Sequence, residues 1–144
     1  MIDNVGVVGA GLMGAEIALV SALAGKDVIL SDTTQDALDR AVAKLATVLD
    51  KGIQRGFFRE EQKAEALGRI RTSVDLAAHA DRDLVIEAVF ENEDVKAAVF
   101  RQLDAVCKPD AYIASNTSTI SITTLASYVA SERRVNFVGT HFFS

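Results

Sequence analysis

The sequence is poor in cysteine, proline and basic residues, and each shortage excludes a class of protein. Its one cysteine, Cys107, cannot form an internal disulfide, so we expect a protein of a reducing compartment, the cytoplasm, with a buried and unreactive thiol. One proline and a hydrophobic fraction of 49% exclude a disordered or proline-rich chain. With 15 basic against 20 acidic residues, the net charge of -5 argues against a nucleic-acid partner.

Long apolar runs are missing as well. None reaches the roughly 20 residues that a bilayer span requires, and the N-terminus shows no signal-peptide pattern. We therefore expect no membrane contact, a small-molecule substrate and no metal site.

What the sequence does contain is a series of short apolar, β-branched runs separated by helical patterns. This alternation predicts an α/β domain over residues 1–144 with a doubly wound, mostly parallel sheet. The expected strands are Val5–Gly9, Val28–Ser31, Ile70–Ser73, Leu84–Val89, Tyr112–Ser115 and Phe137–His141. The expected helices include Met13–Ala24, closed by Gly25, and a later one with an apolar stripe of Val95, Val99, Leu103 and Val106.

The connection between Asp32 and Arg69 is too long for a plain crossover helix. Its apolar residues recur at helical spacing, and Gly52 and Gly56 break the pattern before a second short helix at Glu60–Leu67. We predict a helical hairpin inserted between strands 2 and 3. It either stabilises the sheet or contacts the substrate, and the pattern does not choose between the two.

A glycine-rich motif follows the first strand directly and opens the first helix. It reads Gly9-Ala10-Gly11-Leu12-Met13-Gly14. In a Rossmann domain the first glycine permits the tight turn, the second lets the backbone approach a pyrophosphate, and the third lets the helix pack closely. The N–H groups at the helix start then hold the anion, so we predict dinucleotide binding by these six residues.

Asp32, at the end of the second predicted strand, selects the cofactor. A carboxylate there accepts hydrogen bonds from the adenosine ribose and repels a 2′-phosphate. The next residues, Thr33 and Thr34, offer no arginine to such a phosphate, so NAD is favoured over NADP. The other interpretation of Asp32 is a helix N-cap.

Polar residues cluster after three later strands, where a doubly wound sheet binds its ligands. The clusters are Glu91-Asn92 with Lys96, Ser115–Ser118, and Thr140-His141. Oxidation of a hydroxyl needs a base for the O–H proton, and His141 suits that role near neutral pH. We expect His79 to lie in a surface turn before the fourth strand, without a catalytic role.

At these residues the sequence resembles the 3-hydroxyacyl-CoA dehydrogenase family over almost its whole length. The motifs that carry the resemblance are Gly9–Gly14, Ile86–Asn92, Ser115–Ser118 and Gly139–Phe143. Ser144 and the stretch Val85–Glu91 are more similar to the dehydrogenase part of multifunctional β-oxidation enzymes, which are fused to an enoyl-CoA hydratase.

The resemblance implies a role for individual residues. His141 is then the general base, Ser118 hydrogen-bonds the substrate oxygen beside Asn116, and Glu91 with Lys96 borders the ribose and nicotinamide of NAD. The helical hairpin is similar to the one that contacts coenzyme A in the family. Its coenzyme-contacting positions do not align cleanly, and Arg55 is a candidate phosphate partner by its charge.

In the family the chain continues beyond this point into a glutamate that pairs with the histidine and into a helical domain through which members dimerise. We therefore expect 144 residues that bind NAD and, by themselves, turn over little acyl-CoA. Two alternatives remain: an NAD-sensing or scaffold module without chemistry, and part of a β-hydroxyacid dehydrogenase. The pairing of Ser118 with His141 argues against the last.

Overall fold

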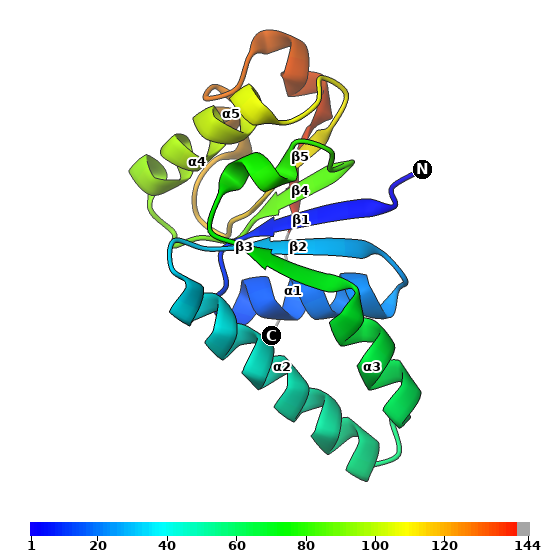
Figure 1. Ribbon diagram of the computed structural model, residues 1–144. Coiled ribbons are helices and arrows are strands. Elements are labelled where there is room, and N and C mark those ends of the chain that lie inside the picture. The colour runs from blue at the N-terminus through cyan, green and yellow to red at the C-terminus, as the bar shows by residue number, and fades with distance from the viewer. Residues whose placement is uncertain (141–144) are drawn as a thin grey trace.

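All six predicted strands form, and they lie in one parallel sheet (Figure 1). The computed structural model describes residues 1–140, and within them the strand order is β3-β2-β1-β4-β5-β6. The strands are β1 (Asn4–Val8), β2 (Asp27–Ser31), β3 (Ile70–Ser73), β4 (Leu84–Glu87), β5 (Tyr112–Asn116) and β6 (Phe137–Thr140). This order confirms the doubly wound Rossmann fold, and its reversal between β1 and β4 opens a crevice at the carboxyl ends of the strands.

Helices cover both faces of the sheet, and each face has its own apolar core. One face carries α1 (Leu12–Leu23), α2 (Gln35–Gln54) and α3 (Glu60–Gly68). The other carries α4 (Glu93–Val106), α5 (Ile122–Ala126) and the 3₁₀ helix η1 (Leu76–His79), while a second 3₁₀ helix, η2 (Ser131–Asn136), leads into β6. Because strands buried on both faces need apolar residues throughout, the continuous apolar runs of β1, β4 and β5 follow from this layering.

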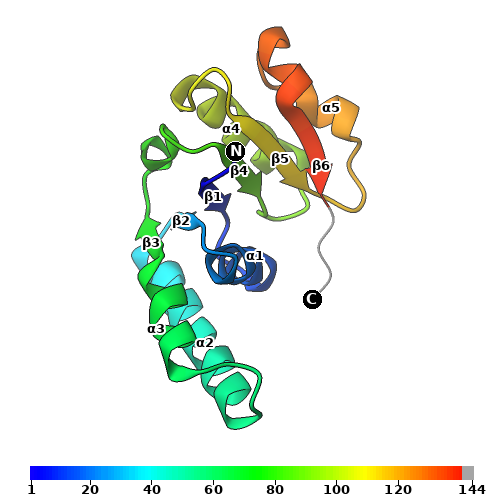
Figure 2. The same ribbon diagram turned by 90° about the vertical axis from the view of Figure 1, so that its right-hand side faces the viewer.

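The predicted insertion is a helical hairpin, in which α2 and α3 lie side by side and project away from the sheet (Figure 2). The Thr34 hydroxyl caps α2 by accepting the Ala37 N–H at 3.2 Å. Helix α2 runs through Gly52, where a Cβ would collide with the Phe58 ring, and ends before Gly56, whose φ is +80°. The first of the two predicted breaks is therefore wrong: Gly52 leaves room for the ring of Phe58, which lies in the connection between the two helices.

The face that α4 buries is also rotated from the predicted one. Val95 is exposed, and the buried residues of this helix are Lys96, Ala97, Phe100 and Leu103. A stripe read from apolar residues alone omits Lys96, because a lysine is expected in solvent unless its charge is paired.

Two minor sequence expectations meet opposite outcomes. Cys107 is buried and unpaired, and burial raises the pKa of its thiol to about 11, which confirms an unreactive side chain. His79 is fully buried in η1, so its placement in a surface turn is wrong. Its Nε2 lies 2.9 Å from Ser31 Oγ, and its ring occupies the space beside Gly6 where any Cβ would collide with it.

Within residues 1–140 no helix has the length and apolarity needed to cross a bilayer.

The buried ring of His79 makes the stability of the fold dependent on pH. Burial lowers the pKa of His79 from 6.5 to about 4, with a further contribution from the Arg82 charge. Between these pH values the unfolded chain binds a proton that the folded chain does not, so the free energy of unfolding falls as the pH drops from 6.5 toward 4. The shift corresponds to about 3 kcal/mol.

Urea unfolding of the wild type and of His79→Gln at pH 7 and pH 4 measures this effect. Glutamine keeps a donor near the Nε2 position but does not titrate, so the wild type should lose about 3 kcal/mol more than the variant over this interval. Parallel losses in the two proteins would show that His79 does not contribute.

Candidate functional site

The glycine motif forms a tight loop between β1 and α1 at the carboxyl edge of the sheet. Gly9 has a φ of +108°, in the left-handed region, and its N–H donates to the Ser31 carbonyl at 2.8 Å. A Cβ on Gly14 would overlap the Gly9 carbonyl oxygen, so glycine is needed there for α1 to start this close to the loop. Gly11 is the N-cap of α1, and no side chain caps the helix start. The first N–H groups of α1 are thus left for a ligand.

Asp32 joins this loop to the end of β2. Its Oδ2 accepts the Ala10 N–H at 2.8 Å and its Oδ1 accepts the Thr33 N–H at 2.6 Å. The N-cap of α2 is Thr34, so the interpretation of Asp32 as a helix cap is wrong. The carboxylate stands beside the glycine loop, where the ribose of a dinucleotide is expected.

A cavity of about 620 Å³ opens over this loop. Its walls come from the loop and α1, from α2, and from the segment after β4. They are formed by Gly9, Ala10, Gly11, Leu12, Met13, Ala15, Glu16, Asp32, Thr33, Ala37, Arg40, Ala41, Lys44, Leu45, Val48, Ala88, Val89, Phe90 and Val95. A volume of this size is typical of small-molecule and cofactor sites.

Two cations in this wall escaped the sequence analysis. Arg40 and Lys44 lie on α2 and line the cavity one helical turn apart. Neither forms a hydrogen bond or an ion pair with another residue of the described part of the chain. Unpaired cations in a cavity favour an anionic ligand. Arg40 follows Ala37 by three residues, and Lys44 follows Ala41 by three, so each cation lies on the same face of α2 as a cavity-lining alanine. This helical spacing was the signal available in the sequence.

The residues around the loop fit a dinucleotide. A Cβ on Gly11 would point into open space with no atom within 4 Å, although the same loop crowds Gly9 and Gly14. That space, the uncapped N-terminus of α1 and the neighbouring Asp32 carboxylate are what a pyrophosphate and an adenosine ribose require.

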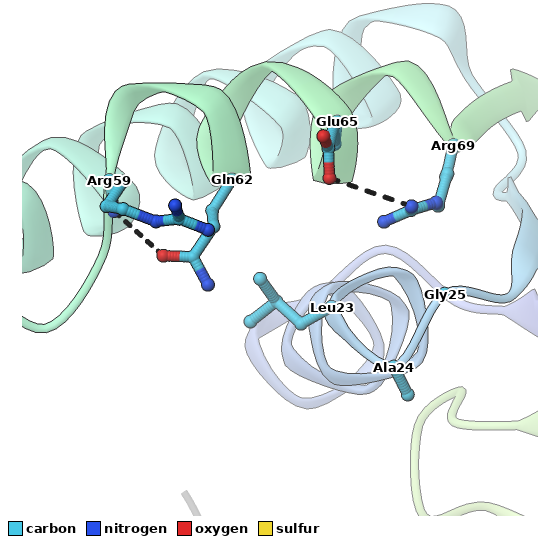
Figure 3. A pocket seen from close by; sticks show the side chains of 7 residues that line it. All are labelled: Leu23, Ala24, Gly25, Arg59, Gln62, Glu65 and Arg69. Atoms are coloured by element: carbon cyan, nitrogen blue, oxygen red, sulfur yellow. Dashed lines mark hydrogen bonds and ion pairs between the residues drawn. The ribbon is translucent and has the colours of Figure 1, made fainter.

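A second, smaller cavity of about 250 Å³ lies at the other edge of the sheet (Figure 3). It lies between the C-terminal end of α1, at Leu23–Gly25, and the helix α3. Gln62 and Glu65 face it from α3, and Arg59 and Arg69 face it from the two ends of that helix. Because ligands of doubly wound sheets bind at the carboxyl ends of the strands, this cavity is not the candidate site.

Beyond the cavity wall, Glu91 holds the turn that follows β5. Its Oε2 accepts the Ser118 N–H at 2.8 Å and the Ser118 hydroxyl at 3.2 Å, and its Oε1 accepts the Thr117 hydroxyl at 2.7 Å. Burial alone would raise the pKa of Glu91, but these hydrogen bonds and the nearby Lys96 charge outweigh it and lower the pKa to about 2. The carboxylate is therefore ionised at any working pH.

Lys96 approaches this group from α4 and is fully buried. Its Nζ lies 2.5 Å from Glu87 Oε2, 3.6 Å from Glu91 Oε1 and 3.4 Å from the Asn116 carbonyl oxygen. Ser115, from the predicted polar segment Ser115–Ser118, and Glu87, which was not predicted as a site residue, complete the cluster. A carboxylate inside an otherwise apolar strand run was the sequence signal for Glu87.

The remaining predicted site residues are placed as follows. Asn116 ends β5 opposite Thr140 of β6, so the strand ends that carry the polar residues are neighbours. Arg55 caps the C-terminus of α2, is exposed, and does not line the cavity. His141 lies outside the described residues, immediately after Thr140 in the sequence.

Comparison with known proteins agrees with this arrangement. Residues 4–144 match the family model described as 3-hydroxyacyl-CoA dehydrogenase, NAD binding domain. A 3-hydroxybutyryl-CoA dehydrogenase of Bradyrhizobium diazoefficiens is 46% identical over 144 residues, and a fatty acid oxidation complex subunit alpha of Psychrobacter cryohalolentis is 43% identical over 143 residues. The crystal structure of (S)-3-hydroxybutyryl-CoA dehydrogenase from Ralstonia eutropha superposes with a TM-score of 0.95 at 41% identity, over 99% of this chain and 50% of that one.

These relatives are longer than the chain. The match to the Bradyrhizobium dehydrogenase covers 100% of this chain and 48% of that protein. The match to the Psychrobacter subunit covers 99% of this chain and 20% of that protein. The match includes the glycine loop, Asp32 and the polar strand ends, and the family model is that of a cofactor domain. The chain belongs to the 3-hydroxyacyl-CoA dehydrogenase family, as its NAD-binding domain.

Proposed function

We propose that this chain is the cofactor domain of an enzyme that oxidises (S)-3-hydroxyacyl-CoA to 3-oxoacyl-CoA with NAD, in fatty-acid β-oxidation or a related acyl-CoA pathway. The observation that carries the proposal is the turn at Ser118, which Glu91 holds at the carboxyl edge of the sheet, one residue beyond the cavity-lining Phe90. The names of the relatives, 3-hydroxybutyryl-CoA dehydrogenase and fatty acid oxidation complex subunit alpha, support this substrate class.

Each site residue has a distinct task in this reaction. Bound NAD⁺ supplies the hydride acceptor. We assign His141 as the base that takes the proton of the substrate hydroxyl. Ser118 is exposed, and its hydroxyl, which lies 3.2 Å from Glu91 Oε2, can turn to donate a hydrogen bond to the substrate oxygen while His141 takes the hydroxyl proton. Glu91 and Lys96 border the nicotinamide ribose, and Asn116 adjoins the substrate.

The coenzyme A part of the substrate is assigned to the hairpin of α2 and α3. Arg55, exposed at the end of α2, is the proposed phosphate partner, because a guanidinium forms strong paired hydrogen bonds with phosphate oxygens. We place the reaction in the cytoplasm and expect the full-length protein to be a homodimer or part of a multifunctional enzyme. The 144 residues on their own should bind NAD and turn over little substrate.

Steady-state assay of the full-length protein with 3-hydroxybutyryl-CoA and NAD⁺ tests the assignment. We expect His141→Ala to lower kcat by about 10²- to 10⁴-fold with NADH affinity unchanged, because a positioned general base contributes a factor of that order. Ser118→Ala should lower kcat/KM by about tenfold through the lost hydrogen bond.

Two results would overturn the assignment. A His141→Ala enzyme with more than half the wild-type rate would remove the proposed base. A wild-type protein that binds NADH but neither binds nor oxidises acyl-CoA would instead be an NAD-sensing module.

A separate result would contradict the expectation that the 144 residues need further residues for activity. It would be oxidation of substrate by these 144 residues alone at about 1 to 10³ s⁻¹, the ordinary range of enzymes.

A further inference from the structure

A fully buried charged cluster lies beneath the Ser118 turn. Glu87, Lys96 and Ser115 each have no exposed surface. Glu87 Oε2 accepts Lys96 Nζ at 2.5 Å and the Val89 N–H at 2.7 Å, and its Oε1 accepts the Ser115 hydroxyl at 2.6 Å. One carboxylate thus ties together β4, β5 and α4.

Such a cluster is expected to stabilise the contact between these elements little, if at all. Removing two charges from water carries a penalty that their attraction often does not exceed, and apolar side chains of similar volume stabilise a fold as well or better. The adjacent core around Phe100 and Leu103 shows that α4 already packs on the sheet through apolar contacts. The charges therefore call for a reason other than stability.

The contacts of Lys96 lead from the cluster to the site. Its Nζ lies 3.6 Å from Glu91 Oε1, and Glu91 in turn accepts the N–H and the hydroxyl of Ser118. The same Nζ lies 3.4 Å from the carbonyl oxygen of Asn116, in the strand end that leads into the Ser118 turn. The Lys96 ammonium thus contacts both the carboxylate that binds the Ser118 turn and the strand end that leads into it. Glu87 is the group that fixes the position of this ammonium.

We propose that Glu87 is a positioning residue of the site. It holds the Lys96 ammonium so that Glu91 and the Ser115–Ser118 segment keep the arrangement needed by the nicotinamide half of NAD and by the substrate oxygen. This inference rests on the proposed function, since it assigns Lys96 and Glu91 to the nicotinamide side. It leaves the adenosine half to the glycine loop and Asp32, with which the Glu87 side chain forms no hydrogen bond or ion pair in the described part of the chain.

The test compares Glu87→Gln with the wild type in calorimetric titrations with NADH and with ADP. ADP has the adenosine ribose and the pyrophosphate but neither the second ribose nor the nicotinamide ring. We expect NADH to bind about tenfold more weakly, because a charge-assisted contact is lost, and the affinity for ADP to change less than about twofold. In spectra of ¹⁵N-labelled protein, the Ser118 and Thr119 amide signals should shift as the Glu91 hydrogen bonds rearrange.

Asp104→Asn is the matched control. Asp104 lies on the same helix, α4, and forms a partly buried ion pair with Arg133 at 2.6 Å, toward the opposite end of the helix from Lys96. This variant should be destabilised as well, yet it should bind NADH and ADP as the wild type does and leave the Ser118 signal in place. A merely structural role of Glu87 would make the two variants alike.

If Glu87→Gln does not fold, Ser115→Ala provides the test, because it removes only the 2.6 Å hydrogen bond to Glu87 and leaves the ion pair. It should weaken NADH binding about threefold without affecting ADP binding. Unchanged NADH affinity in whichever of the two variants folds, or equal losses for both ligands, would overturn the inference. A wild-type protein that binds no NADH would instead overturn the proposed function.

Discussion

Gly11→Ala should weaken NADH binding by about 10- to 100-fold and leave the fold intact. No atom lies within 4 Å of the position that the new methyl group would occupy, so the ligand-free protein accommodates it. A pyrophosphate that approaches the loop backbone would meet this methyl group and lose a hydrogen bond to a charged group. Such a bond contributes about 1.5 to 3 kcal/mol, which corresponds to the stated loss.

Fluorescence titration with NADH measures the effect, and Gly68→Ala is its control. Gly68 also has open space around it, at the end of α3 and away from the cavity, so its substitution should change neither the affinity nor, by more than about 1 kcal/mol, the stability. Equal NADH affinity of Gly11→Ala and wild type would mean that no ligand approaches the loop here.

Asp32→Asn should change the choice between the two nicotinamide cofactors. Asparagine keeps an oxygen that can accept the Ala10 N–H, so the loop stays anchored, but it neither binds the ribose as an ionised acceptor nor repels a 2′-phosphate. Arg40 and Lys44, unpaired in the same cavity, are available to such a phosphate. We expect NADH to weaken by about tenfold or more and NADPH to hold or gain affinity.

The ratio of NADH to NADPH dissociation constants reports this change. Asp36→Asn removes the same charge from the exposed first turn of α2, outside the cavity wall, and should leave the ratio as it is in the wild type. If the two variants showed the same ratio, the discrimination would not depend on the carboxylate of Asp32.

Much of the fold was predictable because strands buried on both faces and amphipathic helices leave clear patterns. All six strands and the hairpin of α2 and α3 were predicted from the spacing of apolar residues, and the left-handed turn at Gly25 was predicted from its position after a helix. The short elements η1, α5 and η2 escaped prediction, since one turn of helix shows no periodicity.

The site was predictable where a motif specifies the backbone and not where burial depends on tertiary partners. The glycine loop and Asp32 lie together as their spacing indicated, and the comparisons confirm NAD as the cofactor. Lys96 and His79 are buried against expectation, Lys96 because Glu87 neutralises it and His79 because Gly6 leaves room for its ring. Gly6 is far from His79 in the sequence, and Glu87, nine residues before Lys96, lies on a different element, so neither pairing follows from helical or strand spacing. The roles of Ser118 and His141 stay predictions.

Titration of ¹⁵N-labelled protein with NADH tests the central claim most directly, because it identifies the residues that meet the cofactor. The account predicts saturable shifts of the Gly9, Gly11 and Asp32 amides around the larger cavity. The absence of any shift at millimolar NADH, or shifts confined to Leu23–Gly25 at the smaller cavity, would contradict it.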